Sequence, residues 1–258
     1  MCLGSCKDNV VTQLAAGIAG YSIATVKTPE ALGAAMADLA CRGCIVDAAG
    51  AKHAGSAAVH HPPIVANDVG GVEVPCAIPF AELTGAAGSG DEEVLLVPFE
   101  QEHAAFAYYN TINPTSLAAL VAQGQATAAE LALSSDDRVC LPITLNHSMG
   151  FGFGVLAALS AGASIVLPAP APDAAATVAA VRDEDCTILF ADSHTLKHLP
   201  SESVPADQPS LRGGIIKIGS GEAFGLDTPR VWAGVELTTV GKPAPASAAG
   251  HGHSHSSK

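Results

Sequence analysis

Aromatic and charged side chains are both scarce in this sequence. Phe, Trp and Tyr make up 4% of the 258 residues, and Asp, Glu, Lys and Arg make up 14%, against about 25% charged residues in an average soluble domain. Positive charge is the scarcer sign, because 12 Lys and Arg stand against 25 Asp and Glu and leave a net charge of -13. Nucleic-acid backbones and anionic membranes both attract basic surfaces, so neither is an expected partner. No apolar run reaches the roughly 18–20 residues that a transmembrane helix needs.

The shortage of positive charge is concentrated in one stretch. The 85 residues between Lys52 and Arg138 contain no Lys or Arg but eleven acids, among them Asp91, Glu92 and Glu100. A polyanionic ligand would be repelled by such a stretch, because nothing in it offers a compensating charge.

The seven cysteines show no pairing pattern. Their odd number and irregular spacing predict reduced thiols and therefore an intracellular, reducing compartment; the cytosol and a mitochondrion or other organelle both stay open. Cys41 and Cys44 form a C-x-x-C pair, which a redox motif or half a zinc site would also show. The preferred interpretation is that Cys41 ends a helix and Cys44 opens a buried strand.

Short β-branched runs alternate with Ala-rich helical stretches along the chain. Strands are expected at 23–26, 44–47, 104–109, 139–144, 164–167, 187–190, 214–219 and 235–239, and helices at 115–133, 148–161 and from Asp173 to Val181. A further helix is expected to begin at Thr28-Pro29-Glu30, between the first two strands, and to join them as a parallel pair. This alternation predicts an α/β fold of layered, mainly parallel sheets with flanking helices.

The expected organisation is one domain over residues 1–242, with two subdomains at about 1–103 and 104–242 as an option. Ala, Ser, Gly and His dominate residues 243–258, which predicts a flexible tail.

The block from 135 to 167 has the most specific order of residues. It runs Asp-Arg, then Leu-Pro, then His147 and Gly150, then Gly-Ala and Val-Leu. Residues 16–47 and 186–222 are two further stretches that carry the same likeness. Together these three stretches resemble the large N-terminal domain of the adenylate-forming superfamily, the acyl-CoA synthetases and their AMP-binding relatives. The resemblance covers roughly residues 10–222 and implies the fold of that domain.

The resemblance also implies positions for remnant binding sites. His147 and Gly150 match the family's acyl pocket, although a hydrogen-bonded His at a strand-to-helix turn is an equal alternative. Gly219, Ser220 and Gly221 match the loop that borders adenine, with a tight turn as the alternative. Neither a cofactor nor a metal site is expected.

The phosphate-binding loop of the family is degenerate here. In the family this loop is rich in Ser, Thr and Gly and ends in Pro-Lys-Gly, so that backbone N–H groups and a cation hold the phosphates. The corresponding stretch, 106–116, has neither Gly nor Lys and lies inside the gap in positive charge. The residues of this degenerate loop are Tyr109, Asn110, Thr111, Asn113 and Pro114.

Two further parts of the family pattern are missing. Residues 235–243 lack the aromatic-Gly-x-Thr-Glu motif whose Glu reaches magnesium, and no small C-terminal domain with its catalytic Lys follows. These losses predict a catalytically inactive pseudoenzyme that acts as a structural or accessory subunit, with other protein subunits as partners. The alternative is an AMP-forming ligase, or an adenylate- or acyl-binding protein, with unorthodox site residues.

Two smaller motifs have structural interpretations. Gly150, Gly152 and Gly154 do not form the dinucleotide fingerprint, and we expect them to allow close packing of a helix on the sheet. His194 and His198 are spaced for one face of a helix, where a solvent-facing pair is preferred to a metal site.

Overall fold

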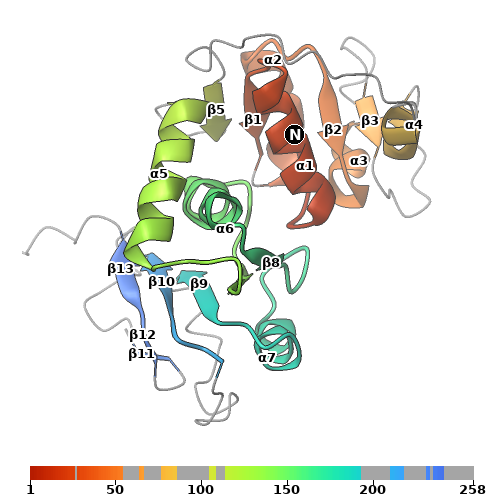
Figure 1. Cartoon of the computed structure of the whole chain (residues 1–258). Coiled ribbons are helices and arrows are strands. Elements are labelled where there is room, and N and C mark those ends of the chain that lie inside the picture. The colour runs from red at the N-terminus through yellow and green to blue at the C-terminus, as the bar shows by residue number, and fades with distance from the viewer. Residues whose placement is uncertain are drawn as a thin grey trace, which may run out of the picture.

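The computed structural model of the chain describes residues 1–26, 28–54, 64–66, 77–85, 105–108, 114–192, 210–217, 231–232 and 235–240. Two neighbouring parts can be followed in Figure 1: an N-terminal part of short strands and small helices, and a C-terminal part built on one larger sheet.

The C-terminal part contains a five-stranded sheet in which all neighbouring strands run parallel. Its strands are β7 (Arg138–Cys140), β8 (Ser164–Val166), β9 (Ile188–Asp192), β10 (Gly213–Lys217) and β13 (Thr238–Val240). Their order across the sheet is β13-β10-β9-β7-β8. The predicted α/β class with mainly parallel sheets is thereby confirmed.

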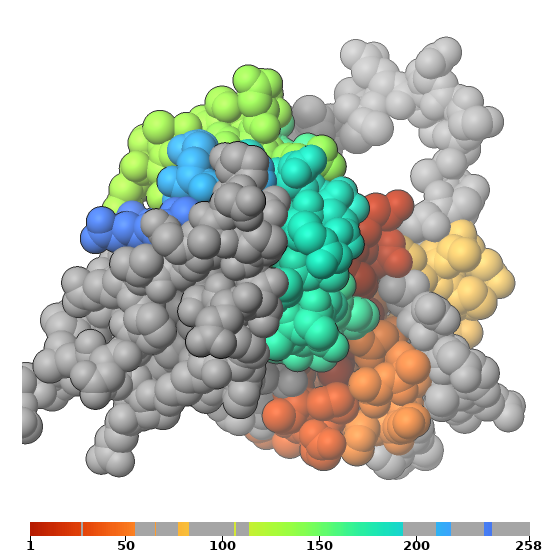
Figure 2. Space-filling model, turned by 90° about the horizontal axis from the view of Figure 1, so that it is seen from below, coloured from red at the N-terminus to blue at the C-terminus, as the bar shows by residue number. Residues whose placement is uncertain are grey.

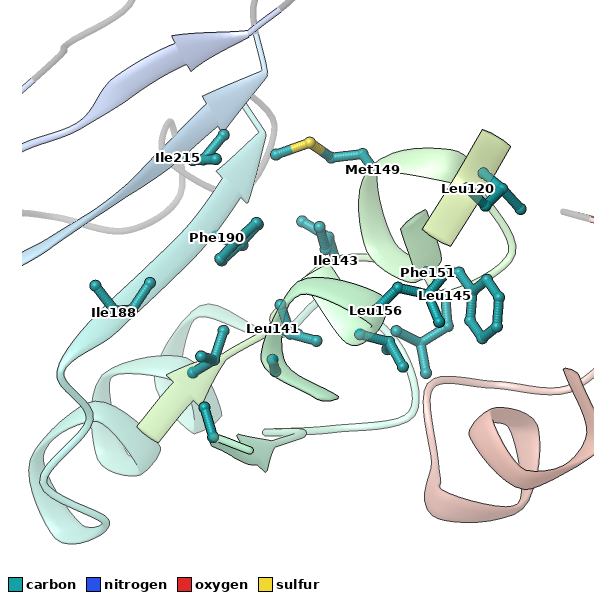
Figure 3. Packing of buried hydrophobic residues seen from close by; sticks show 14 of the residues in the cluster. Leu120, Leu141, Ile143, Leu145, Met149, Phe151, Leu156, Ile188, Phe190 and Ile215 are labelled. Carbon is teal, nitrogen blue, oxygen red and sulfur yellow. The ribbon is translucent and has the colours of Figure 1, made fainter. Parts of the chain in front are cut away.

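Helices cover both faces of this sheet, which is why its strands are apolar at successive positions. The helices of this part are α5 (Leu117–Glu130), the π-helix η2 (Met149–Val155), α6 (Leu156–Ala161) and α7 (Ala174–Asp183). Ile188, Phe190 and Ile215 share one buried cluster with residues of α5, η2 and α6 (Figure 3). Leu189 and Ile216 belong to a second cluster, which includes α7.

The N-terminal part contains two small sheets. Its elements are α1 (Lys7–Ile18), β1 (Ile23–Thr25), the 3-10 helix η1 (Pro29–Ala31), α2 (Leu32–Asp38), β2 (Cys44–Val46), α3 (Ala48–Ala54), β3 (Ile64–Ala66), β4 (Ile78–Pro79), α4 (Phe80–Gly85), β5 (Ala105–Tyr108) and β6 (Thr115–Ser116). The orders are β2-β3-β4, all parallel, and β1-β5-β6, in which β6 is antiparallel to β5.

The predicted parallel pairing of strands 23–26 and 44–47 is wrong, because β1 and β2 lie in different sheets. β1 pairs instead with β5. The ring of Phe106 in β5 stacks on Phe151 with 5.5 Å between centroids, so this sheet joins the cluster beneath η2. Val46 of β2 is buried in a separate cluster with α2 and α3. Packing partners far away in the sequence therefore decided which strands pair.

Two other predicted elements are subdivided. The strand expected at 235–239 is split: β12 (Val235–Glu236) pairs antiparallel with β11 (Val231–Trp232), while β13 joins the large sheet. Leu237, between them, is buried in the second cluster. The helix expected at 148–161 begins as the π-helix η2 and continues as α6.

The two parts are joined near the N-terminus of the chain. The N–H of Cys2 donates to the carbonyl oxygen of Ile45 in the N-terminal part at 2.9 Å. Three residues later, the N–H of Ser5 donates to the carbonyl oxygen of Pro170 in the C-terminal part at 2.8 Å. Figure 2 shows the resulting contact from below, where the surface of the first 50 residues meets that of the segment around α7.

An ion pair ties together the amino-terminal ends of the strands. The Asp137 carboxylate, just before β7, accepts hydrogen bonds from Arg212 Nε at 2.9 Å and Nη2 at 2.7 Å. Arg212 stands just before β10 and also donates to the carbonyl oxygens of Leu131 and Ala132 after α5. The guanidinium holds the pKa of the Asp137 carboxyl well below its usual range. This pair fixes the end of α5 against the amino-terminal ends of the strands.

Candidate functional site

The carboxyl-terminal edge of the five-stranded sheet has the topology of a ligand site. The chain leaves β7 towards β8 on one side, whereas β9 and β10 lie on the other side of β7. Such a switch point opens a crevice outside the carboxyl ends of the central strands, where ligands of open α/β sheets bind. Residues that follow β7, and those that end β9 and β10, are therefore the first candidates.

The segment that follows β7 is held rigidly by its own side chains. Leu141, Ile143 and Leu145 are buried in the main cluster, which fixes every second residue of the segment. Asn146 attaches this segment to the N-terminal part of the molecule. Asn146 Nδ2 donates to the carbonyl oxygen of Leu3 at 2.9 Å, and its Oδ1 accepts from Asn9 Nδ2 at 3.1 Å.

Helix α1 contributes a buried polar face to the same connection. Asn9 and Gln13 are fully buried one turn apart, and Gln13 Nε2 donates to Asn9 Oδ1 at 2.7 Å and to the carbonyl oxygen of Leu145 at 3.1 Å. Ser5 Oγ donates to the carbonyl oxygen of Ile143 at 3.1 Å and accepts from the N–H of Leu145. Most of these buried polar groups satisfy one another, although Gln13 Oε1 is buried without a hydrogen-bond partner among the described residues. They also hold the backbone that leads to residue 147.

His147 lies at the turn from this segment into η2. Its carbonyl oxygen accepts from the N–H groups of Gly150 and Phe151, both at 3.0 Å, which begins the helix. Its ring nitrogen Nδ1 accepts from the N–H of Met149 at 3.1 Å. The other ring nitrogen, Nε2, lies 3.0 Å from Lys217 Nζ at the end of β10. The ring is thus oriented from both sides.

Lys217 shares its face of the sheet with an acid. It pairs in register with Asp192 of β9, two positions beyond the pair Ile215 and Phe190. Because side chains alternate along a strand, both lie on the face that packs beneath η2. The edge therefore combines an imidazole, an ammonium and a carboxylate.

The glycines of the Gly-x-Gly-x-Gly motif allow η2 to lie close to the segment before it. A Cβ on Gly150 would collide with the carbonyl oxygen of Thr144, and one on Gly154 would lie 2.7 Å from Leu141 Cδ2. Gly150, Gly152 and Gly154 do allow close packing, but the neighbours lie in the segment after β7 and in α5 rather than in the sheet itself.

The structure brings together only some of the predicted site residues. His147 and Gly150 lie in one turn at the start of η2, and the acyl pocket expected there stays a prediction. Pro114 is exposed just before β6. Other predicted residues lie outside the described residues: Tyr109, Asn110, Thr111, Asn113, His194, His198, Gly219, Ser220 and Gly221.

Sequence reasoning missed Lys217 and the polar face of α1. The sequence pattern places Lys217 within an expected strand, and its signal is that a charged residue stands two positions before Gly219 in an otherwise apolar run. Asn9 and Gln13 carried a usable signal, since they are polar residues at helical spacing that interrupt an apolar helix.

Metal and thiol chemistry finds no support in the part of the chain that the structure describes. Among those residues, no group of three or more His, Cys, Asp or Glu side chains is placed to hold a metal ion. Cys41 and Cys44 are free thiols, and burial raises the pKa of Cys44, which opens β2 as predicted. No helix within the described ranges is long and apolar enough to span a bilayer.

Comparison with known proteins supports the family and the fold of this chain. The family model described as AMP-binding enzyme matches residues 112–249. The acyl-CoA ligase sidI of Beauveria bassiana is 38% identical over 86 residues, which are 33% of this chain and 15% of that protein.

Solved structures share the fold. A benzoate CoA ligase from Burkholderia xenovorans superposes with a TM-score of 0.67 at 18% identity, and apo MatB from Rhodopseudomonas palustris with 0.67 at 16% identity. Each alignment covers 92% of this chain and 48% of the other, so the chain spans about half the length of these proteins. The chain belongs to the AMP-binding enzyme family and has the α/β fold of the N-terminal domain of acyl-CoA ligases.

Proposed function

We propose that this acyl-CoA-ligase-like chain does not form adenylates itself and serves as a structural or accessory subunit of a larger protein assembly. The observation that carries the proposal is the absence of any Lys or Arg between Lys52 and Arg138, where eleven acids stand. ATP brings about four negative charges, and a cation beside its phosphates is a recurrent requirement of phosphoryl chemistry. The degenerate loop at 109–114 offers none.

The beginning of α5 supports the same proposal. Thr115 and Ser116 are engaged in the antiparallel strand β6, opposite Phe106 and Ala105. Ser116 Oγ then accepts from the N–H of Ala119 at 3.2 Å and caps the helix. One of the free N–H groups with which a helix start could bind a phosphate is thereby already satisfied.

Exposed apolar side chains on and just after α1 favour a role among other proteins. Val11, Ile18 and Tyr21 are 42%, 61% and 69% exposed. Because α1 turns polar residues inward to hold the segment before His147, some of its apolar residues are left outside. A contiguous apolar patch is typical of surfaces that meet a partner, and we propose that these three side chains contribute to one.

The second candidate is an adenylate- or acyl-binding protein with unorthodox site residues. The observation that favours it is the contact between His147 and Lys217 at the carboxyl edge of the sheet, because it places a cation where ligands of such sheets bind.

ATP titration calorimetry and ATP–pyrophosphate exchange with a panel of carboxylic acids test the proposal. We expect neither binding nor exchange. Thr115→Lys is the informative variant, because it supplies a cation directly after Pro114 and retains the Ser116 cap. It should increase ATP affinity by about tenfold if the missing cation is the cause. Micromolar binding of ATP to the unaltered chain, or pyrophosphate exchange, would refute the proposal.

The accessory role has its own test. Purified from its source, the chain should carry other subunits with it in a fixed ratio. A monodisperse monomer without any partner, measured by size-exclusion chromatography with light scattering, would count against that role.

A further inference from the structure

We propose that an exposed stripe on α1 binds the same stripe of a second copy of the chain, with the two helices antiparallel. The stripe consists of Val11, Ala15, Ile18 and Tyr21, whose side chains are all exposed. Helix α1 lies on the outside of the N-terminal part, as Figure 1 shows. The proposal names one partner for this surface, so it rests on the interaction role proposed above but not on the loss of ATP chemistry.

The polarity of α1 is inverted, and this keeps the stripe outside. Asn9 and Gln13 are fully buried, and both donate hydrogen bonds to the segment that follows β7. The stripe lies about half a helical turn away from them, because each residue advances by about 100° around the helix. Turning α1 to bury the stripe would break those hydrogen bonds. The fold therefore holds an apolar face towards solvent.

The end of α1 fixes the last residue of the stripe. Gly20 has a φ of 81°, and the N–H of Tyr21 donates to the carbonyl oxygen of Ala16 at 2.8 Å. This is a Schellman motif, in which a residue in the left-handed region closes the helix. The backbone of Tyr21 is therefore held beside the last turn, and the stripe continues past the end of the helix.

The stripe is complementary to itself when two copies of α1 run antiparallel. A two-fold axis near Ala15 brings Val11 of each copy opposite Ile18 of the other, because the two residues lie on opposite sides of Ala15 at similar spacing. The small side chain of Ala15 at the crossing lets the helix axes approach to about 8 Å, the lower end of the range for packed helices. Each contact is then formed twice, as in any isologous dimer.

Lys7 favours the antiparallel direction. It is exposed in the first turn of α1, where the helix dipole disfavours a cation, and it takes part in none of the ion pairs found among the described residues. The last turn of α1 carries no basic residue. In the antiparallel pair, Lys7 lies beside the negative end of the other helix and beside the ring of its Tyr21, both of which attract a cation. A parallel pair would instead bring two Lys7 side chains together.

The resulting dimer should be weak. A contact of about three helical turns lies at or below the roughly 1,200–2,000 Å² of a stable interface. Each copy also carries a net charge of -13, which opposes association. At about 150 mM salt, the Debye length of about 8 Å screens much of this repulsion. We therefore expect a Kd on the order of 10–100 μM, as suits a small interface.

Sedimentation equilibrium of the full chain at physiological salt tests the proposal. We expect a monomer–dimer equilibrium with a Kd in the range given above. Ile18→Glu should weaken the dimer by about a hundredfold or more, because the interface buries this side chain twice. Leu159→Glu is the matched control, since Leu159 is 45% exposed on α6 and lies outside the stripe. It should leave the Kd unchanged.

Further variants test the antiparallel arrangement. Val11→Lys and Ile18→Glu should each be monomeric alone and should pair when mixed, because a Lys then faces a Glu.

Covalent trapping tests the contact at the two-fold axis. Ala15→Cys should give a covalent dimer with oxidised glutathione, since two introduced thiols form one disulfide and release two molecules of reduced glutathione. Helix axes at 8–10 Å leave about 5 Å between facing Cα atoms, which a disulfide spans. Ala129→Cys, exposed on α5, should give no such dimer, and neither should the unaltered chain.

Several results would overturn the proposal. A monomer at every concentration would do so, as would equal dissociation constants for Ile18→Glu and Leu159→Glu. Failure of the mixed variants to pair would exclude the antiparallel contact. A monomer whose stripe binds anionic vesicles, or a subunit of another sequence, would show that the surface serves a different partner. The accessory role is decided separately, by the subunits that accompany the chain from its source.

Discussion

Asp136 and Asp137 are adjacent in the sequence, yet replacing each with Asn should have very different effects on stability. The Asp137 side chain is 5% exposed and accepts five hydrogen bonds, whereas Asp136 lies at the surface. Two of the five come from Arg212, one from Thr187 Oγ1 at 2.7 Å, and two from the N–H and Oγ of Ser134. Asp137→Asn keeps the shape but removes the charge, and it turns an NH2 group towards these donors.

The size of the effect follows from these contacts. A hydrogen bond to a charged group contributes about 1.5–3 kcal/mol, and a buried group left facing the wrong partner costs a similar amount. The Arg212 side chain is 42% exposed, so water recovers part of the loss. We expect Asp137→Asn to lower the free energy of unfolding by about 3 kcal/mol at pH 7, which corresponds to about 6–12 °C in Tm for a chain of this size. Asp136→Asn should change Tm by less than about 2 °C.

The pH dependence provides a second measurement. The pKa of the Asp137 carboxyl is lowered in the folded state, first by the hydrogen bonds from Arg212. Its contribution to stability is therefore present above the pKa of the unfolded chain, about 4, and is lost as the pH falls through the lowered folded value. Urea unfolding followed by circular dichroism should show the difference between the unaltered chain and Asp137→Asn shrinking below about pH 4. Equal stabilities of the two Asn variants at pH 7 would refute this reasoning.

Two further predictions concern the segment before η2 and the helix that holds it. Gly150→Ala should destabilise the fold by about 2 kcal/mol or more, because its Cβ would collide with the carbonyl oxygen of Thr144. Gly33→Ala in α2, where a Cβ meets nothing within 4 Å, should instead stabilise the chain by up to about 1 kcal/mol; chemical denaturation of the pair checks both. Asn9→Ala should cost about 2–3 kcal/mol, because it leaves the Oδ1 of Asn146 without its donor. Retention of the full free energy of unfolding in Asn9→Ala would show that the polar face of α1 does not hold this segment.

The alternation of apolar runs and Ala-rich stretches was sufficient to predict the fold class. It was sufficient because a parallel strand buried on both faces is apolar at successive positions, and this pattern is local in the sequence. Local chemistry also predicted the start of α7, where Asp173 Oδ1 accepts from the N–H of Ala176 at 2.8 Å. The pairing of β1 with β5 could not be predicted in the same way, because the stacking of Phe106 on Phe151 joins residues far apart in the chain.

The residues of the candidate site also differ in whether the sequence alone could identify them. His147 was found because it matches the acyl-pocket motif of the family that the sequence resembles, and a short motif is visible without knowledge of the fold. Lys217 was not found, because its place in the site depends on the 3.0 Å contact with His147, which strand order creates across 70 residues.

The sequence by itself determined the α/β class and the missing positive charge between Lys52 and Arg138. Only the tertiary structure decided that Asp137 rather than Asp136 is buried against Arg212, and that His147 faces an amine. Both outcomes depend on which strand ends are brought together, and packing in three dimensions sets that.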